Sequence, residues 1–386
     1  MNILFDLIST QDFVNGGGEY TKTVFLRLCE KNAGSNNQVF GFFDSKRRFA
    51  FDDFQKNQIE NLSNVTLVDI NGTSINELVR RYHIDKVFIG IAQKIAKCSN
   101  FEPLECPVIC VIHDMAHQET QNVGLPMYLQ QDNFKEYTKQ FLLKHLFEEK
   151  RHVNKDMTHL IDSVLKSEGC FITVSDYSKN SIEYLTKIPS NKISVLYSPL
   201  KKNEVKSTIE NTVLKTLIGE NEKYLLAVSA NRPLKNVQKA INAYKRLVEK
   251  EDCGVKFVTV GYKGKSACPG HVILPYLSES DLEYAYMNCY GFVYTSLLEG
   301  FGYPPVEAMK FGKAVLSSNV CSMPEILGRA AIYASPYYEV DIYRAMKMLV
   351  DEESNKEFAV LSKARYASIE DRQNRDLEKL IDKILN

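Results

Sequence analysis

The chain has 386 residues, 44% of them hydrophobic and 25% charged, and its 48 Lys and Arg residues balance 48 Asp and Glu residues. This length fits two domains, and the composition is that of an ordinary globular protein. A formal net charge of zero argues against a nucleic-acid partner, because such proteins need a basic surface to neutralise phosphates. Nine cysteines without a paired CxxC spacing predict reduced, buried thiols and no zinc site.

The amino terminus has no basic start, and its apolar run, residues 2–8, is too short for a signal peptide. No apolar stretch approaches the roughly 18 residues of a membrane span. We therefore expect a cytoplasmic protein. Basic groups at 46–48 and 201–202 are interpreted as solvated surface, with a weak peripheral membrane contact as the alternative.

The first half alternates strand-like and helix-like segments, which predicts a parallel α/β sheet. The predicted strands are residues 2–8, 38–43, 65–69, 86–90, 107–112 and 170–174. This first domain is expected to end near residues 193–200. Residues 201–222 form a charged segment that is typical of a linker with an irregular helix.

A glycine-rich segment, residues 15–19, separates the first strand from a helical pattern at residues 20–28. It lacks the Gly-x-Gly-x-x-Gly fingerprint, which disfavours an NAD-dependent oxidoreductase. We interpret Gly17 and Gly18 as part of a tight turn whose amides face a phosphate or an acceptor.

Residues 117–167 are largely helical and polar, with Phe134, Tyr137, Phe141 and Leu142 spaced for one helical face. A core-facing amphipathic helix is favoured over a lid on the acceptor side. A second α/β set begins at residue 224, with strands at 256–260, 271–274, 291–295 and 314–317. The charged tail, residues 354–386, has a helical pattern.

The segment 296–309 contains the sequence EGFGYPPVE at residues 299–307, which places two carboxylates eight positions apart around a glycine-rich turn. It joins a predicted strand to a helix at 306–311, so it lies at the carboxyl edge of a sheet, where ligands bind. Gly300 and Gly302 allow close backbone approach, and the amides of the helix start suit a diphosphate. Either Glu299 or Glu307 could grip a vicinal diol of a sugar through bidentate hydrogen bonds.

These motifs resemble the retaining glycosyltransferases of family 4, also called glycosyl transferases group 1. The similarity is clear over residues 223–335 and includes the segments 274–286, 314–319 and 323–326 around the motif. Two shorter signatures at 111–115 and 172–178 are similar to the family's amino-terminal half. The resemblance implies the α/β GT-B fold, with two Rossmann-like domains that face each other across a cleft. The domains would be 1–200 on the acceptor side and 201–370 on the donor side, and residues 371–386 would be a helix that crosses back.

The resemblance also implies roles for residues on the donor side. Glu307 would bind the ribose hydroxyls of the donor nucleotide, and Glu299 would contact the donor sugar. The backbone of Gly300, Phe301 and Gly302 would face the sugar or the diphosphate. The segment ahead of the motif adds Tyr276 and Leu277 to the expected donor-binding residues.

The family places cations after the first strand of the second domain to neutralise the diphosphate, a role that falls here on Lys235 and Arg232. Lys235 matches the family pattern, whereas Ser229 and Ala230 stand where a glycine is usual. His113 ends an apolar run at a sheet edge. Local sequence favours a structural histidine, and the resemblance implies contact with the donor sugar.

The implied function is a retaining, metal-independent hexosyltransferase that uses a UDP- or GDP-sugar and a glycan or lipid-linked acceptor. Surface polysaccharide synthesis is the expected setting, at the inner face of the membrane if the protein contacts one, and no cofactor is expected. The alternative is a non-catalytic nucleotide-sugar-binding subunit. The base, the sugar, the acceptor and the linkage stay open.

Overall fold

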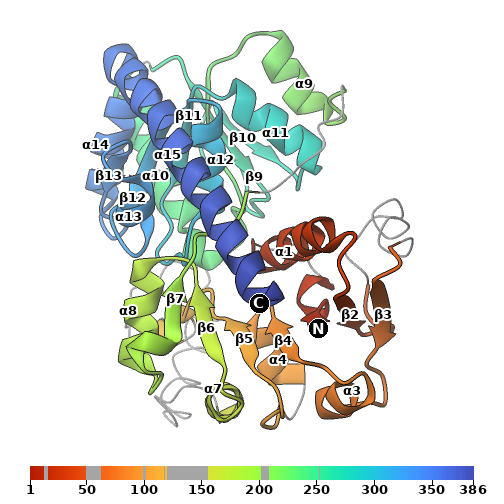
Figure 1. Ribbon diagram of the computed structural model, residues 1–386. Coiled ribbons are helices and arrows are strands. Elements are labelled where there is room, and N and C mark those ends of the chain that lie inside the picture. The colour runs from red at the N-terminus through yellow and green to blue at the C-terminus, as the bar shows by residue number, and fades with distance from the viewer. Residues whose placement is uncertain are drawn as a thin grey trace. The chain divides into compact units, whose positions relative to one another are not determined.

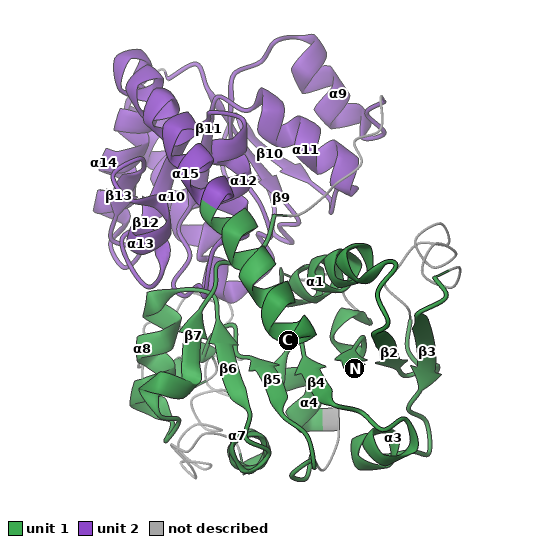
Figure 2. Ribbon diagram, viewed as in Figure 1, with its two compact units in different colours: residues 1–122, 144–201, 372–386 green, residues 123–143, 202–371 purple. Residues whose placement is uncertain are grey.

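The computed structural model describes residues 1–12, 16–48, 62–98, 101–116, 118–119, 155–200, 208–251 and 253–386. These residues fall into two compact units, coloured separately in Figure 2. Unit 1 contains the described residues within 1–122, 144–201 and 372–386, and unit 2 contains those within 202–371. Each unit is an α/β sheet with its own core.

Unit 1 has a parallel sheet, seven-stranded within the described residues, in the order β3-β2-β1-β4-β5-β6-β7. Its strands are β1 (Asn2–Asp6), β2 (Gln38–Phe43), β3 (Val65–Asp69), β4 (Lys86–Ile89), β5 (Val108–Val111), β6 (Cys170–Thr173) and β7 (Ile193–Val195). Strand β5 is buried at every position, which explains its uninterrupted apolar sequence. The order reverses between β1 and β4, as in Rossmann folds.

The helices of unit 1 pack onto this sheet (Figure 1). They are α1 (Gly16–Asn32), α3 (Ile75–Arg81), α4 (Ala92–Cys98), α7 (Lys155–Lys166) and α8 (Asp176–Leu185), with a short 3-10 helix η1 (Ile8–Thr10) after β1. Helix α3 begins with a capping box between Ser74 and Glu77. The predicted first strand 2–8 is too long, because the chain turns into η1 after Asp6.

The prediction that a glycine turn precedes a helix starting at residue 20 is wrong. Gly16 to Gly18 form the first turn of α1. Glycine has a low helix propensity because of its backbone freedom, so three glycines favoured a turn over a helix start. Gly17 has a steric reason, since a Cβ at this position would lie 2.8 Å from Ile91 Cδ1.

The helical face predicted from Phe134, Tyr137, Phe141 and Leu142 lies outside the described residues. The end of that region is described and is helical, as α7, with Met157, Leu160, Ile161 and Val164 buried in the core of unit 1.

Unit 2 also has a parallel sheet, six-stranded within the described residues, in the order β10-β9-β8-β11-β12-β13. Its strands are β8 (Tyr224–Ala227), β9 (Lys256–Val260), β10 (His271–Leu274), β11 (Gly291–Tyr294), β12 (Ala314–Ser318) and β13 (Ile332–Ala334). This is again the Rossmann order, and the reversal falls between β8 and β11.

The helices of unit 2 are α9 (Thr212–Gly219), α10 (Val237–Lys250), α11 (Glu279–Asn288), α12 (Tyr303–Lys310), α13 (Met323–Leu327), α14 (Glu339–Val350) and most of α15 (Glu352–Leu385). The helix predicted at 306–311 is α12, which begins three residues earlier because Pro304 and Pro305 occupy its first turn. Prolines are favoured there, since their missing N–H groups would have no intrahelical partner.

Residues 372–386, the end of α15, belong to unit 1 (Figure 2). Arg27 Nε on α1 donates to Glu378 at 2.6 Å, and Lys31 Nζ donates to Asp382 at 2.7 Å. Exposed ion pairs of this kind contribute only about 0.2–1 kcal/mol each. Leu380, Ile381 and Ile384 are almost fully buried. Because each buried aliphatic side chain contributes about 1.5–3 kcal/mol, these three residues stabilise the end of α15 more than the ion pairs do.

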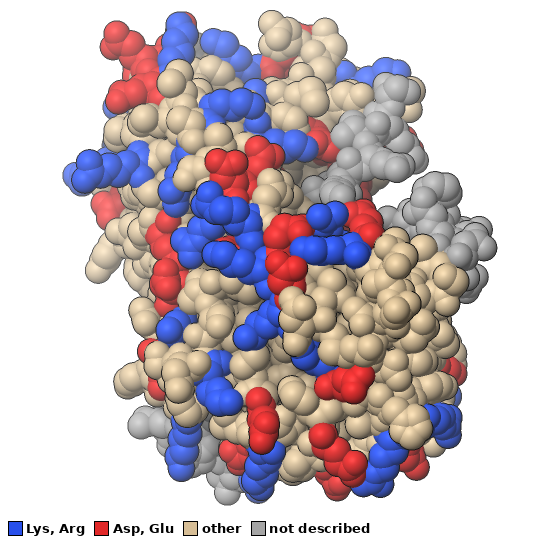
Figure 3. Space-filling view, in the orientation of Figure 1, with Lys and Arg blue, Asp and Glu red and all other residues tan. Residues whose placement is uncertain are grey.

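None of the helices formed by the described residues is both long and apolar enough to cross a membrane. On the face drawn in Figure 3, basic and acidic side chains are interspersed, as the balanced composition leads one to expect.

Candidate active site

The loops that follow β8 and β11 meet where the strand order of unit 2 reverses. A short 3-10 helix η4 (Pro233–Lys235) follows β8. Leu297 N donates to Leu234 O at 2.8 Å, and Thr295 Oγ1 donates to Asn236 O at 3.1 Å. These bonds tie the two loops together at the edge where open α/β sheets bind ligands.

Lys235 and Glu299 form a largely buried ion pair on these loops, with side chains 12% and 13% exposed. The hydroxyl of Tyr294, at the end of β11, donates to Glu299 Oε1 at 2.6 Å and accepts from Lys235 Nζ at 2.6 Å. Ser296 Oγ also donates to Glu299 Oε1, at 2.6 Å. Among the described residues every side-chain contact of Glu299 falls on Oε1, so Oε2 keeps its capacity to accept a hydrogen bond.

Two buried tyrosines lie beside the two glutamates of the motif. Burial, followed by the charge and hydrogen bond of Glu299, keeps the pKa of Tyr294 well above its ordinary value. Burial, followed by the charge of Glu307, does the same for the pKa of Tyr286 on α11. Both phenols therefore stay neutral near pH 7, and the bond from Tyr294 holds the Glu299 carboxylate in a fixed position.

The turn between the glutamates depends on a left-handed glycine. Gly302 has φ +87° and directly precedes α12. Pro304 and Pro305 carry no N–H, so the anion-binding capacity of this helix start is smaller than the sequence pattern suggested.

We expect Gly302→Ala to destabilise the protein by about 1–3 kcal/mol, because it forces a side chain into left-handed backbone. The new Cβ would also lie 2.2 Å from the Met323 methyl group, which must move. A lower melting temperature in thermal unfolding checks the prediction. Gly254→Ala is the matched control, since Gly254 has φ +56° and nothing within 4 Å of a Cβ. Equal losses in the two variants would contradict a role for the Met323 contact.

Three other residues that were predicted to bind the donor are exposed or only half-buried. The Arg232 side chain is exposed and makes no hydrogen bond or ion pair among the described residues. Tyr276 is 62% exposed, with its hydroxyl on Asn231, and Leu277 is half-buried. Ser229, which replaces the family's usual glycine, has φ +55° and so adopts the left-handed conformation that favours glycine.

Unit 1 places a buried carboxylate where its own strand order reverses. Asp6, the last residue of β1, is fully buried and accepts from Ser9 N at 3.0 Å and from Gly90 N at 3.1 Å. Burial raises its pKa, although these hydrogen bonds act in the opposite direction. Sequence reasoning missed Asp6, whose only signal was a charged residue ending an apolar strand.

His113 follows β5 and lies beside the loop that contains Gly90. Its Nε2 is 3.0 Å from Gly90 O, and its ring packs edge-on against Tyr20 with centroids 4.8 Å apart. Burial lowers the pKa of His113 to about 4, so the imidazole is neutral near pH 7. A carbonyl can only accept, so Nε2 carries the proton and Nδ1 keeps its lone pair.

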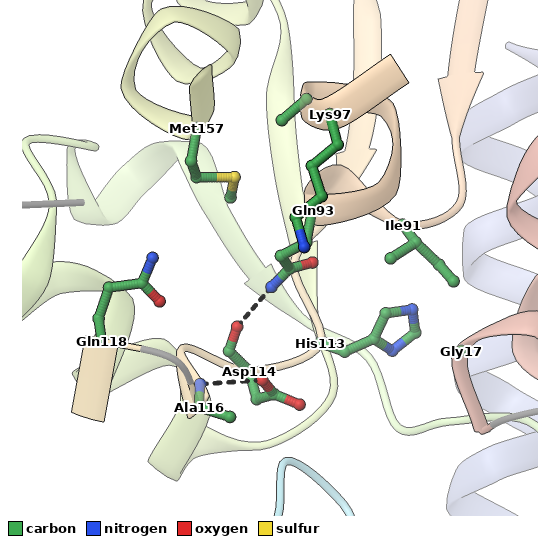
Figure 4. Close-up of a pocket in the computed structure, with 10 residues that line it drawn as sticks. Gly17, Ile91, Gln93, Lys97, His113, Asp114, Ala116, Gln118 and Met157 are labelled. Carbon is green, nitrogen blue, oxygen red and sulfur yellow. Dashed lines mark hydrogen bonds between the residues drawn. The ribbon is translucent and has the colours of Figure 1, made fainter. Parts of the chain in front are cut away.

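His113 and Gly17 line a cavity of about 530 Å³ within unit 1 (Figure 4). The remaining lining residues are Ile91, Gln93, Ala96, Lys97, Asp114, Ala116, Gln118 and Met157. Asp114 Oδ1 accepts from Ala116 N at 3.0 Å, which orients the loop after β5. Within the described part of the chain, no group of three or more His, Cys, Asp or Glu residues could hold a metal ion.

Two Rossmann-like units, each with a strand order that reverses at one point of its sheet, make up the GT-B fold. Solved structures with this fold match the chain over its full length. One is Anabaena Alr3699/HepE in complex with UDP, at 14% identity and a TM-score of 0.64, with 100% of this chain and 99% of that chain covered. Another is WaaG, a glycosyltransferase involved in lipopolysaccharide biosynthesis, at 13% identity and a TM-score of 0.62, with 100% and 99% covered.

The second unit also matches a family model. Residues 209–363 match the family described as Glycosyl transferases group 1. The match includes Lys235 and both glutamates of the motif.

The curated relatives that match this chain are named mannosyltransferases. O-antigen chain mannosyltransferase B of Escherichia coli is 29% identical over 205 residues, 48% of this chain and 51% of that protein. O-antigen chain mannosyltransferase RfbU of Salmonella typhimurium is 30% identical over 187 residues, 46% and 49% of the two chains. The serotype-specific mannosyltransferase WbdA of Escherichia coli is 27% identical over 280 residues, 67% and 31%. The chain therefore spans about half or less of the length of the curated relatives that it matches.

Proposed function

We propose that this protein transfers a hexose from a nucleoside diphosphate sugar to a glycan or lipid-linked saccharide. Mannose is the favoured sugar, because the curated relatives are named mannosyltransferases, and two of these names specify the O-antigen chain. The proposed setting is surface polysaccharide synthesis in the cytoplasm, at the membrane face if a lipid-linked acceptor is used.

The contact between Lys235, Tyr294 and Glu299 is the observation that carries this proposal. Lys235 supplies a cation at the edge where a diphosphate would lie, and negative charge on that leaving group grows as the glycosidic bond breaks. A fixed cation therefore stabilises the transition state more than the bound donor. Glu299 Oε2 and the Glu307 carboxylate supply acceptors for hydroxyl groups of the sugar and the ribose.

The proposed reaction keeps the anomeric configuration of the donor and needs neither a metal nor a cofactor. The acceptor hydroxyl attacks from the face that the leaving group departs from, and a phosphate oxygen of the donor takes its proton. Protein groups then act by positioning the two substrates and by stabilising charge. A non-catalytic nucleotide-sugar-binding subunit is the alternative. It would keep donor binding but show no transfer.

Titration of the purified protein with UDP, GDP, ADP and NAD, with and without EDTA, tests the donor site. We expect one diphosphate to bind selectively and the affinity to survive EDTA. Incubation with the matching mannose donor and a mixed glycan acceptor pool then tests transfer, and NMR of the product reports the anomer. A response to NAD alone would contradict the proposal, and an inverted product would contradict the retaining mechanism.

A further inference from the structure

Gly90 directly follows β4, where the strand order of unit 1 reverses. A Cβ at this position would lie 2.2 Å from Thr21 Oγ1 on α1, so no other residue fits without movement. Thr21 is itself held, because its Oγ1 donates to Gly17 O at 2.9 Å. Glycine has little backbone preference of its own. The direction of the Gly90 carbonyl therefore depends on the contacts that its neighbouring peptide groups make.

The buried carboxylate of Asp6 fixes the N–H group of Gly90. Gly90 N donates to Asp6 Oδ2 at 3.1 Å, and Ser9 N donates to Asp6 Oδ1 at 3.0 Å. The Ser9 hydroxyl also donates to Oδ2. Asp6 and Ser9 are both fully buried, so bulk water does not compete for these bonds. The turn after β1 thus holds the carboxylate, and the carboxylate holds the Gly90 backbone.

The carbonyl of the same glycine fixes the ring of His113. His113 Nε2 lies 3.0 Å from Gly90 O, and a carbonyl can only accept, so Nε2 carries the proton. A neutral imidazole has two tautomers, and this bond favours the one in which Nδ1 keeps its lone pair. If the Gly90 carbonyl turned away, the preference would be lost. The tautomer of His113 thus depends on a carboxylate at the end of another strand.

We propose that Asp6 is a positioning residue for His113, which acts through the Gly90 backbone and keeps Nδ1 of the ring without a proton. The consequence for sugar transfer rests on the proposed function, because only then does a substrate hydroxyl group reach His113. A hydroxyl group can donate to Nδ1 in this tautomer, whereas the other tautomer places an N–H group there. Asp6 therefore acts on transfer through two other residues and does not touch the substrate.

Asp6→Asn is the variant that tests this proposal. The new NH2 group can face either Gly90 N or Ser9 N. When it faces Gly90 N it donates to the Ser9 hydroxyl, so this orientation leaves fewer polar groups unpaired. Gly90 N then loses its acceptor, and the Gly90 carbonyl is no longer held against His113. We expect the ratio of the Nε2–H to the Nδ1–H tautomer to fall about three- to tenfold, the worth of one neutral hydrogen bond.

Long-range proton–nitrogen NMR of the full chain, with nitrogen-15 in its histidines, measures this ratio near pH 7. Burial lowers the pKa of His113 to about 4, so the ring is neutral under these conditions. His113→Gln removes the signals of this ring and thereby assigns them. The unmodified protein should show His113 in the Nε2–H tautomer. That measurement tests the proposal even if Asp6→Asn does not fold.

Two controls separate positioning from a general loss of stability. Ser9→Ala removes a hydroxyl that donates to the same carboxylate and leaves the bond between Asp6 and Gly90 N in place. Ser167→Ala removes the acceptor of Leu104 N, a buried bond of 2.8 Å elsewhere in unit 1. Both variants should unfold at a lower temperature than the unmodified protein. Neither should change the tautomer ratio of His113.

Initial-rate kinetics connect the tautomer to transfer. Asp6→Asn should lower kcat/KM about three- to tenfold, while the affinity for the nucleoside diphosphate stays unchanged. An Nδ1–H tautomer in the unmodified protein, an unchanged ratio in Asp6→Asn, or an equal shift in Ser167→Ala would overturn the inference. If the unmodified protein neither binds a nucleoside diphosphate nor transfers a sugar, the proposed function is contradicted instead. The NMR result then still decides whether Asp6 positions His113.

Discussion

Lys235→Ala should lower the rate of sugar transfer by about 10²–10³-fold while the protein stays folded. Removing one preorganised group that stabilises developing negative charge costs about 2.7–4 kcal/mol of transition-state stabilisation. Lys235 is held for such a role, because Tyr294 and Glu299 fix its ammonium group at the carboxyl edge of the sheet. Initial-rate kinetics with the nucleotide sugar identified by titration measure the effect, which should appear mainly in kcat.

Lys239→Ala is the matched control for this experiment. Lys239 lies one helical turn further on, in α10, where its Nζ donates to Tyr337 O at 2.6 Å on the surface. Lys239→Ala removes one positive charge from the same region. It leaves the contact between Lys235, Tyr294 and Glu299 in place. Equal rates for Lys235→Ala and the unmodified protein, or equal losses in both lysine variants, would contradict the proposed role of Lys235.

Local sequence was sufficient to predict the strand, the turn and the helix that carry Glu299 and Glu307. Strand β11 and the loop after it were predicted because apolar strand residues and turn residues alternate sharply there. The start of α12 was placed late, since the two prolines interrupt the apolar spacing on which the helix prediction relied. The positions of β11 and α12 are determined by residues close to them in the sequence. The errors in their predicted bounds are therefore confined to a few residues.

The partners of the predicted residues could not be found in this way, because they come from distant segments. Tyr294 was interpreted only as a strand residue, yet its hydroxyl contacts Lys235, 59 positions away. Tyr286 was named only within the segment 274–286 that resembles the family, and its relation to Glu307 depends on how α11 and α12 pack.

His113 shows a different limit. The sequence placed it at a sheet edge and left a structural role and a sugar contact open. The structure adds the direction of its hydrogen bond to Gly90 O and the low pKa that keeps it neutral. Protonation state and tautomer follow from burial and from one carbonyl group, and neither can be derived from the order of residues along the chain.

Glu307→Ala should weaken binding of the preferred nucleoside diphosphate by about 10–150-fold, which corresponds to about 1.5–3 kcal/mol for hydrogen bonds to a charged group. Glu307 lies in α12, and its charge is close enough to Tyr286 to raise the pKa of that phenol further. Calorimetric titration measures the change. Glu339→Ala is the control, because Glu339 begins α14 and contacts only Asn242 among the described side chains, at 2.9 Å.

A double comparison identifies what Glu307 contacts. If its carboxylate grips the ribose diol, the 2′,3′-dideoxy form of the same diphosphate should already bind weakly to the unmodified protein, and Glu307→Ala should not weaken it further. The coupling between the two changes would then be close to the full effect of either one. If Glu307→Ala weakens both nucleotides by the same factor, the carboxylate acts elsewhere, for example by holding Tyr286 and the turn at Gly302. A contact with the ribose requires the two losses to be non-additive, whereas a purely structural role requires them to add.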